Sequence, residues 1–232
     1  MIKGGEFLIK DQEAKNIFIP EDFSEDQLMM ASATKEFVEK ELEPHREQFE
    51  KKDYKLTVDC MKKAGELGLL GISVPAEYGG MGMPFNTSVL ICDKISGANG
   101  SFSTAFGAHT GIGTLPILLY GNEVQREKYL PKLASGEWMG CYCLTEPGAG
   151  SDANSGKTKA VLTEDGEHYL ITGQKMWISN AGFADVFIVF ARIEDDKNIT
   201  GFILEKGMEG ITLGEEEHKL GLNSSSTRQV FF

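Results

Sequence analysis

The sequence predicts an α+β protein in which an all-helical domain, residues 1–135, precedes an antiparallel β-barrel or β-sandwich domain, residues 136–232. The hydrophobic pattern changes its period near residue 136, from helical spacing to the alternation of strands. Glycine, β-branched and aromatic residues become frequent after this point. No helical pattern separates consecutive expected strands, which favours antiparallel pairing, because parallel strands need a crossover connection.

Helices are expected where apolar residues recur at helical spacing between recognisable end signals. The first follows a possible capping box of Ser24 and Gln27 and ends or kinks at Pro44. The second ends at Gly68, and a glycine-rich loop follows at 78–82. The expected helical stretches are 30–42, 58–67, 87–98, 101–119 with breaks at Gly113 and Pro116, and 122–133 with Asn122 as N-cap.

Strands are expected throughout the second domain. Asp165 and Gly166 mark a tight hairpin between the second and third strands. The run 186–191 is continuously apolar, as expected of a strand buried on both faces. Residues 175–179 are expected to continue the strand that begins at Tyr169. The expected strands are 138–144, 157–163, 167–174, 186–193, 201–205 and 228–232.

Composition and charge exclude several classes of protein. The formal net charge of −12 argues against nucleic acids and anionic membrane surfaces as main partners, since both reward clustered Lys and Arg. No run reaches the length of a membrane span, and residues 1–10 lack an apolar targeting core, so a soluble cytoplasmic chain is expected. The four cysteines, Cys60, Cys92, Cys141 and Cys143, form no CxxC pair, and no histidine pair has metal spacing. Reduced thiols in the core, and no metal, are therefore expected.

The segment from Cys141 to Asp152 couples a strand to a glycine-rich turn. Pro147 fixes its own φ, and Gly148 and Gly150 are expected to adopt positive φ, so the turn can present successive N–H groups to an anionic or carbonyl-rich ligand. An ordinary hairpin turn would explain so short a motif taken alone.

A second segment, from Gln174 to Gly182, adds an aromatic ring and a hydroxyl group. Trp177 and Ser179 lie two residues apart on an expected strand and should therefore share one face. A core tryptophan beside a strand-end serine is the plain alternative. The two segments together predict one wall of a pocket for a flat heteroaromatic ring, that is, a flavin.

These two segments resemble the flavin-binding signature of the acyl-CoA dehydrogenase family. The similarity covers nearly the whole chain, and its motifs are long and specific. The wording of 179–185 is most similar to the long-chain and very-long-chain branch. The segments that carry the resemblance are 67–82, 121–137, 142–152, 173–182 and 201–205.

The resemblance implies a chemistry and a set of contacts. Acyl-CoA dehydrogenases use FAD to convert acyl-CoA thioesters into trans-2-enoyl-CoA, with a carboxylate base that removes the α-proton. It implies that Trp177 packs against the isoalloxazine, that the Ser179 hydroxyl bonds near N5, and that Ser151 touches the acyl-CoA or the cofactor's edge. Some relatives carry Thr where this chain has Ser179. The cofactor-binding residues it implies are Tyr142, Cys143, Leu144, Thr145, Gly150, Ser151, Trp177, Ile178 and Ser179.

The resemblance also implies a third, helical domain after the β domain, which in this family carries the catalytic glutamate and completes the FAD site and the oligomer. We expect it beyond Phe232, so the chain is interpreted as an inactive fragment and no catalytic residue is named. Glu137, Glu146 and Glu205 do not lie in apolar pockets that would tune a base, and Glu146 is better suited to hold backbone.

The partners implied are an acyl-CoA substrate, an acceptor of the electron-transfer flavoprotein type, and other copies of the full-length protein. Lys157, Lys159 or Arg192 could supply the local basic patch for a CoA ester, although each is more often a solvated surface charge. His109 is expected in a packed core and His168 on the surface.

Two further functions remain open from the sequence. One is a flavin oxidase or monooxygenase on the same scaffold, which peroxide production under air would favour. The other is a ligand-binding or assembly module that keeps the pocket wall and has no base.

Overall fold

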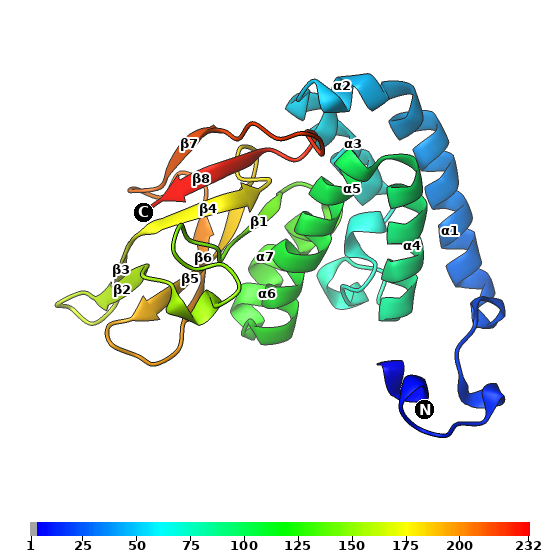
Figure 1. Ribbon diagram of the computed structural model, residues 1–232, viewed down its shortest axis with the longest axis horizontal. Helices are drawn as coiled ribbons and strands as arrows, with labels where there is room; N and C mark the ends of the chain where they lie inside the picture. Colours follow the sequence, from blue (N-terminus) through cyan, green and yellow to red (C-terminus); the bar gives the residue numbers. More distant parts are fainter. Residues whose placement is uncertain (1–3) are drawn as a thin grey trace.

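Residues 4–232 are described by a computed structural model, in which helices form one side of the molecule and strands the other (Figure 1). The order of a helical part followed by a β part is the α+β fold expected from the sequence. Residues 1–3, which begin the expected helical domain and the N-terminal segment, lie outside the described part. No helix among residues 4–232 is long and apolar enough to cross a membrane.

Several helices begin or end at the signals found in the sequence, although α2 (Arg46–Glu50) was not expected and α3 begins four residues earlier than expected, at Tyr54. Ser24 and Gln27 form a reciprocal capping box at the start of α1, and Asn122 and Gln125 form another at the start of α7. Gly68 adopts a φ of +76° just after α3, as a C-terminal glycine does. The helices are α1 (Glu25–Phe37), α2 (Arg46–Glu50), α3 (Tyr54–Glu66), α4 (Phe85–Ala98), α5 (Gly100–Gly107), α6 (Leu115–Tyr120) and α7 (Glu123–Ser135).

The break expected near Gly113 and Pro116 is a π-helix, Ala108–Thr114, between α5 and α6. Its wider turn lets Pro116 enter at the start of α6, where the absent N–H of proline costs no helical hydrogen bond. The π-helix packs on the first strand, and the backbones of Gly113 and Gly140 touch. A Cβ at Gly113 would lie 2.9 Å from the carbonyl carbon of Gly140.

Two sheets make up the β part. In the larger sheet the strand order is β1-β5-β2-β3, with β6 also paired to β5, and in the smaller sheet it is β4-β8-β7. Strand β7 follows glycine-rich turns and was not expected from the sequence. The strands are β1 (Gly140–Cys143), β2 (Lys159–Leu162), β3 (Tyr169–Thr172), β4 (Gln174–Ser179), β5 (Val186–Ile193), β6 (Thr200–Glu205), β7 (Thr212–Glu216) and β8 (Thr227–Phe231).

Two expectations about the strands are wrong. β5 pairs in parallel with both β1 and β2, and the sheets are not closed into a barrel. Between β1 and β5 the chain forms β2 and β3 of the same sheet and β4 of the other sheet, with only a three-residue 3-10 helix, Ala153–Ser155, on the way. The sequence pattern does not reveal this connection. Residues 169–179 also do not form one strand. Gly173 separates β3 from β4, and its Cβ, if present, would lie 2.4 Å from Thr158 Oγ1.

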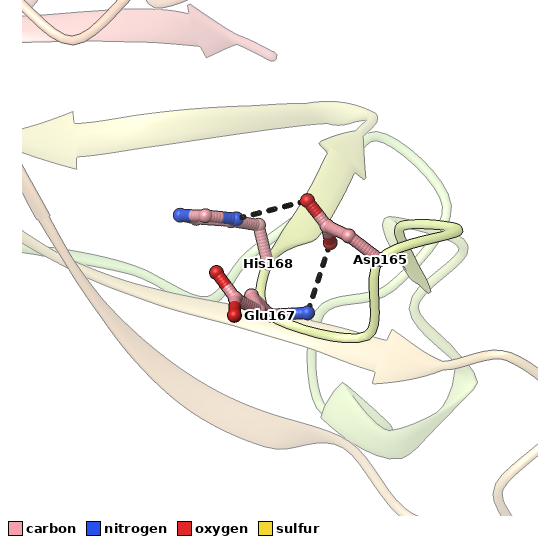
Figure 2. Close-up of side chains that lie close together, drawn as sticks. All are labelled: Asp165, Glu167 and His168. Carbon is pink, nitrogen blue, oxygen red and sulfur yellow. Dashed lines mark hydrogen bonds and ion pairs between the residues drawn. The ribbon is translucent and has the colours of Figure 1, made fainter.

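The expected tight hairpin joins β2 and β3 at Asp165 and Gly166, where Gly166 has a φ of +72° (Figure 2). Asp165 Oδ1 accepts hydrogen bonds from the Glu167 N–H (2.9 Å) and the Thr163 hydroxyl, and Asp165 Oδ2 lies 3.8 Å from His168 Nδ1. Asp165, Glu167 and His168 are all exposed. Hairpin geometry therefore accounts for the proximity of these three side chains, and His168 is a surface residue as expected.

The helical and β parts are joined by buried polar contacts. His109, fully buried in the π-helix, accepts the Gly140 N–H through Nδ1 (3.0 Å) and donates from Nε2 to the Leu133 carbonyl (3.0 Å). The buried Asn180 donates to the Ala105 carbonyl of α5 (2.8 Å). His109 is thus the hydrogen-bonded core histidine expected from the sequence, and the end of β4 is fixed to the helices.

Candidate cofactor-binding wall

The two sequence motifs lie side by side in the structure. The Met176 N–H donates to the Thr145 carbonyl (2.9 Å), and Lys175 Nζ donates to the Leu144 carbonyl (3.1 Å). Trp177 therefore directly follows Met176, whose N–H is hydrogen-bonded to the start of the glycine-rich loop. The geometry needed for one common wall is present.

The tip of the glycine-rich loop is open. Gly148 and Gly150 are exposed, and no atom lies within 4 Å of a Cβ built on either. Neither glycine has the positive φ expected from the sequence. The turn is closed by two backbone hydrogen bonds exchanged between Glu146 and Ala149 (3.0 and 3.1 Å), and it contains no left-handed residue. The open tip leaves room for a ligand against its backbone.

Trp177 occupies a β-bulge. The pairing of β4 with β8 shifts register between Lys175 and Ile178, so two residues of β4 face one residue of β8. Trp177 has a φ of +62°, which is rare for an aromatic residue, and 55% of it is exposed. The bulge turns the indole out of the sheet instead of into the core, and Ser179 at the end of β4 is half-buried.

Two residues of the expected site, Cys143 and Ile178, can offer only backbone atoms to a ligand at this surface, because their side chains are buried. Cys143 and Ile178 are buried in the core between the two sheets. The Tyr142 ring packs against Phe190 at 4.9 Å between ring centroids, and burial raises the pKa of its hydroxyl. The side chains of Cys143 and Ile178 are therefore committed to the core, and the half-buried Tyr142 ring packs against it. Leu144 and Thr145 are half-buried, and Gly150 and Ser151 are exposed.

A buried ion pair behind the loop was not expected from the sequence. Lys175 Nζ lies 2.7 Å from Glu146 Oε1, and the two side chains are 2% and 7% exposed. The carboxylate also accepts the N–H groups of Lys157 (2.6 Å) and Thr158 (3.0 Å). Burial alone would raise the pKa of Glu146, but these hydrogen bonds, together with that from Lys175, hold its pKa below the ordinary value. The sequence signal for this ion pair was a lysine next to the apolar residues Met176 to Ile178 of β4.

The three basic residues considered for the CoA ester differ in how many protein groups they already contact. Arg192 donates to the carbonyls of Asn154, Asp196 and Lys197, so it fixes loops instead of facing a ligand. Lys159 lies 3.6 Å from Asp195, and the side chain of Lys157 is exposed.

An apolar cavity of about 240 Å³ lies within the helical part. It is lined by residues of the segment 69–74, of α4, and of the helix that runs from α5 into the π-helix. The hydroxyls of Ser73 and Ser88 share one hydrogen bond of 2.7 Å, and that of Thr110 donates to the Phe106 carbonyl at 2.9 Å. The wall of the cavity is therefore mainly apolar.

Comparison with known proteins agrees with this architecture. A model of the acyl-CoA dehydrogenase N-terminal domain matches residues 24–137, and a model of the middle domain matches 141–232. A probable acyl-CoA dehydrogenase of Bacillus subtilis (strain 168) is 51% identical over 228 residues, which are 98% of this chain and 38% of that protein.

Two solved structures extend the comparison. The acyl-CoA dehydrogenase from Bacillus anthracis, complexed with FAD, is 48% identical with a TM-score of 0.95 over 100% of this chain and 40% of that one. A structure described as an electron transferring flavoprotein of Acidaminococcus fermentans is 37% identical, with a TM-score of 0.84 over 92% of this chain and 56% of that one.

The chain thus combines a helical part, a β part of two sheets, and two motifs that meet where β4 contacts the glycine-rich loop. The matching relatives with this architecture are oxidoreductases. The chain belongs to the acyl-CoA dehydrogenase family. It spans about two fifths of the length of the Bacillus relatives.

Proposed function

We propose that this chain binds FAD along the wall formed by the glycine-rich loop and the Trp177 bulge, and that the protein dehydrogenates acyl-CoA thioesters to trans-2-enoyl-CoA. The observation that carries the proposal is the hydrogen bond from Met176 to Thr145, which joins the two motifs. The FAD-complexed Bacillus anthracis relative supports the choice of cofactor.

The residues present fit a flavin. An exposed indole stands beside an open loop with two glycines, so a planar ring has both a stacking surface and backbone at close range. Trp177 would pack on the ring, the Ser179 hydroxyl would bond near N5, and Ser151 would meet the acyl-CoA or the cofactor's edge. When bound, FAD supplies the acceptor for a hydride from the substrate's β-carbon.

The three carboxylates weighed as a base from the sequence are each paired with a lysine, which supports a base elsewhere in the full-length protein. Glu146 is committed to Lys175 and to backbone N–H groups. Glu205 lies 2.5 Å from Lys128, and Glu137 lies 3.7 Å from Lys132. We therefore propose that the base lies beyond residue 232 and that these residues alone turn over no substrate. A non-catalytic binding module is the second candidate, favoured by the same commitments.

FAD binding is expected to quench the fluorescence of Trp177. The chain has two tryptophans, and Trp138 packs instead on Tyr129 and Lys132. A Trp138→Phe variant should therefore keep the quenching, whereas Trp177→Phe should abolish it. Trp177→Ala should also weaken FAD binding about tenfold, because a stacked ring pair contributes roughly 0.5–1.5 kcal/mol beyond its buried area. Titration of the three variants with FAD tests this, and quenching that depends on Trp138 would contradict the proposed site.

We further propose that the apolar cavity receives the hydrocarbon tail of the acyl group. Gly107 lines it, and a Cβ there meets no atom within 4 Å. Gly107→Leu should lower affinity for dodecanoyl-CoA relative to butyryl-CoA about tenfold, the equivalent of two methylenes at roughly 0.8 kcal/mol each. Gly97→Leu on α4, equally open and outside the cavity, is the control. Equal losses for both ligands would contradict the assignment.

The remaining expectations are proposals of the same kind. The protein would pass electrons to an electron-transfer flavoprotein, form a homo-oligomer when full length, and act in the cytoplasm. The name of the Acidaminococcus fermentans structure supports the first of these. A preference for long or very long acyl chains would place the protein in the long-chain and very-long-chain branch of the family.

A further inference from the structure

The buried ion pair of Lys175 and Glu146 is not explained by fold stability alone. Removing two charges from water costs several kcal/mol per ion, and apolar residues of similar volume often serve stability equally well. Buried apolar residues lie close to each member of the pair in the sequence, Cys143 before Glu146 and Ile178 after Lys175. What an ion pair adds is fixed hydrogen-bond direction.

The partners of the pair all belong to the segments that lead into and out of the glycine-rich loop. Lys175 on β4 donates to the Leu144 carbonyl at the loop's entrance. Glu146 within the loop accepts from Lys157 and Thr158 at its exit. The pair therefore ties entrance, exit and β4 together at one buried point.

The tip of the loop has little other support. Pro147, Gly148, Gly150 and Ser151 are exposed, and only Ala149 is buried. Ala149 in turn is held by the two backbone hydrogen bonds it exchanges with Glu146. The position of the whole tip consequently depends on residue 146.

We infer that Lys175 and Glu146 are positioning residues, which set the distance between the glycine-rich loop and the Trp177 bulge. The Met176 N–H bond to Thr145 lies between these two sides and reports their alignment. Loss of the pair shifts one side of the wall against the other while the helical core stays intact. The expected effect on FAD affinity rests on the proposed flavin function. The expected effect on the alignment of the loop with the bulge rests on the geometry alone.

The test compares three variants of the 232-residue chain. The double variant Lys175→Met with Glu146→Leu removes both charges together, so that no unpaired buried charge remains. Gly156→Ala keeps both charges but places a Cβ 2.9 Å from Glu146 Oε1, which displaces the carboxylate. Lys128→Met, which removes a partner of the ion pair with Glu205, is the control.

Three quantities are measured: the FAD dissociation constant, the thermal unfolding midpoint, and hydrogen exchange at the Met176 amide. The double variant should bind FAD about tenfold more weakly or worse, with a midpoint within a few degrees of the parent. The Met176 amide should exchange faster in both the double variant and Gly156→Ala, and neither change should occur in Lys128→Met.

Unchanged FAD affinity together with unchanged Met176 exchange overturns the inference. So does a loss of affinity that merely follows a loss of folded protein. If the parent chain does not bind FAD, the proposed binding by this chain fails, and the exchange rate still decides whether the pair aligns the wall.

Discussion

Replacing Gly113 with alanine is expected to lower the free energy of unfolding by about 1–3 kcal/mol, the usual cost of forcing extra atoms into a packed core. The added Cβ would lie 2.9–3.1 Å from three backbone atoms of Gly140, and backbone cannot move aside as a flexible side chain can. The π-helix must therefore separate from β1. Urea denaturation of parent and variant measures the difference.

Gly111→Ala is the matched control for this experiment. Gly111 belongs to the same π-helix, but a Cβ there meets no atom within 4 Å. Because alanine is favoured over glycine in helices by up to about 1 kcal/mol, this variant should be as stable as the parent or more so. Equal destabilisation by the two substitutions would show that helix geometry, and not contact with Gly140, limits position 113.

Acid is expected to destabilise the protein through His109. Burial lowers the pKa of this imidazole to about 4 from an ordinary 6.5, although its hydrogen bond to Leu133 and the nearby Asp185 act in the opposite direction. The unfolded chain therefore takes up a proton at a pH where the folded one does not, and stability falls as the pH drops from about 6.5 to about 4. At roughly 1.4 kcal/mol per pKa unit, the loss amounts to about 3 kcal/mol.

The free energy of unfolding as a function of pH checks this expectation. His109→Gln should flatten the slope between pH 6.5 and pH 4. It should also lower stability at neutral pH, because an unmet buried backbone group costs about 1–3 kcal/mol. His168→Gln, on the exposed hairpin, controls for the loss of one histidine. A slope that persists in His109→Gln would assign the acid sensitivity to other groups.

Features decided by local chemistry were predictable from the sequence. The capping boxes at Ser24 and Asn122, the glycine at position 68 and the turn at Asp165 depend on residues within a few positions of each other. The apolar run at 186–191 likewise gave a buried strand, since burial on both faces requires apolar residues throughout.

Features decided by distant partners were not predictable. The parallel pairing of β5 depends on which strand the chain meets after crossing into the other sheet. The β-bulge that turns Trp177 outward depends on the register of β8, more than 50 residues later. Of the candidate wall, the proximity of the two motifs and the buried thiol of Cys143 were foreseen, whereas the ion pair beneath the wall and the inward side chain of Ile178 were not.

Backbone contact between Gly113 and Gly140, with His109 and Asn180 bonded across the same boundary, ties the helical part to the β part at several points. The apolar cavity and the indole surface lie on opposite sides of this joined boundary. A ligand that spans the cavity and the indole surface would then be selected by how far its tail reaches into the cavity. Selection among chain lengths would not require the helical part to close upon the β part.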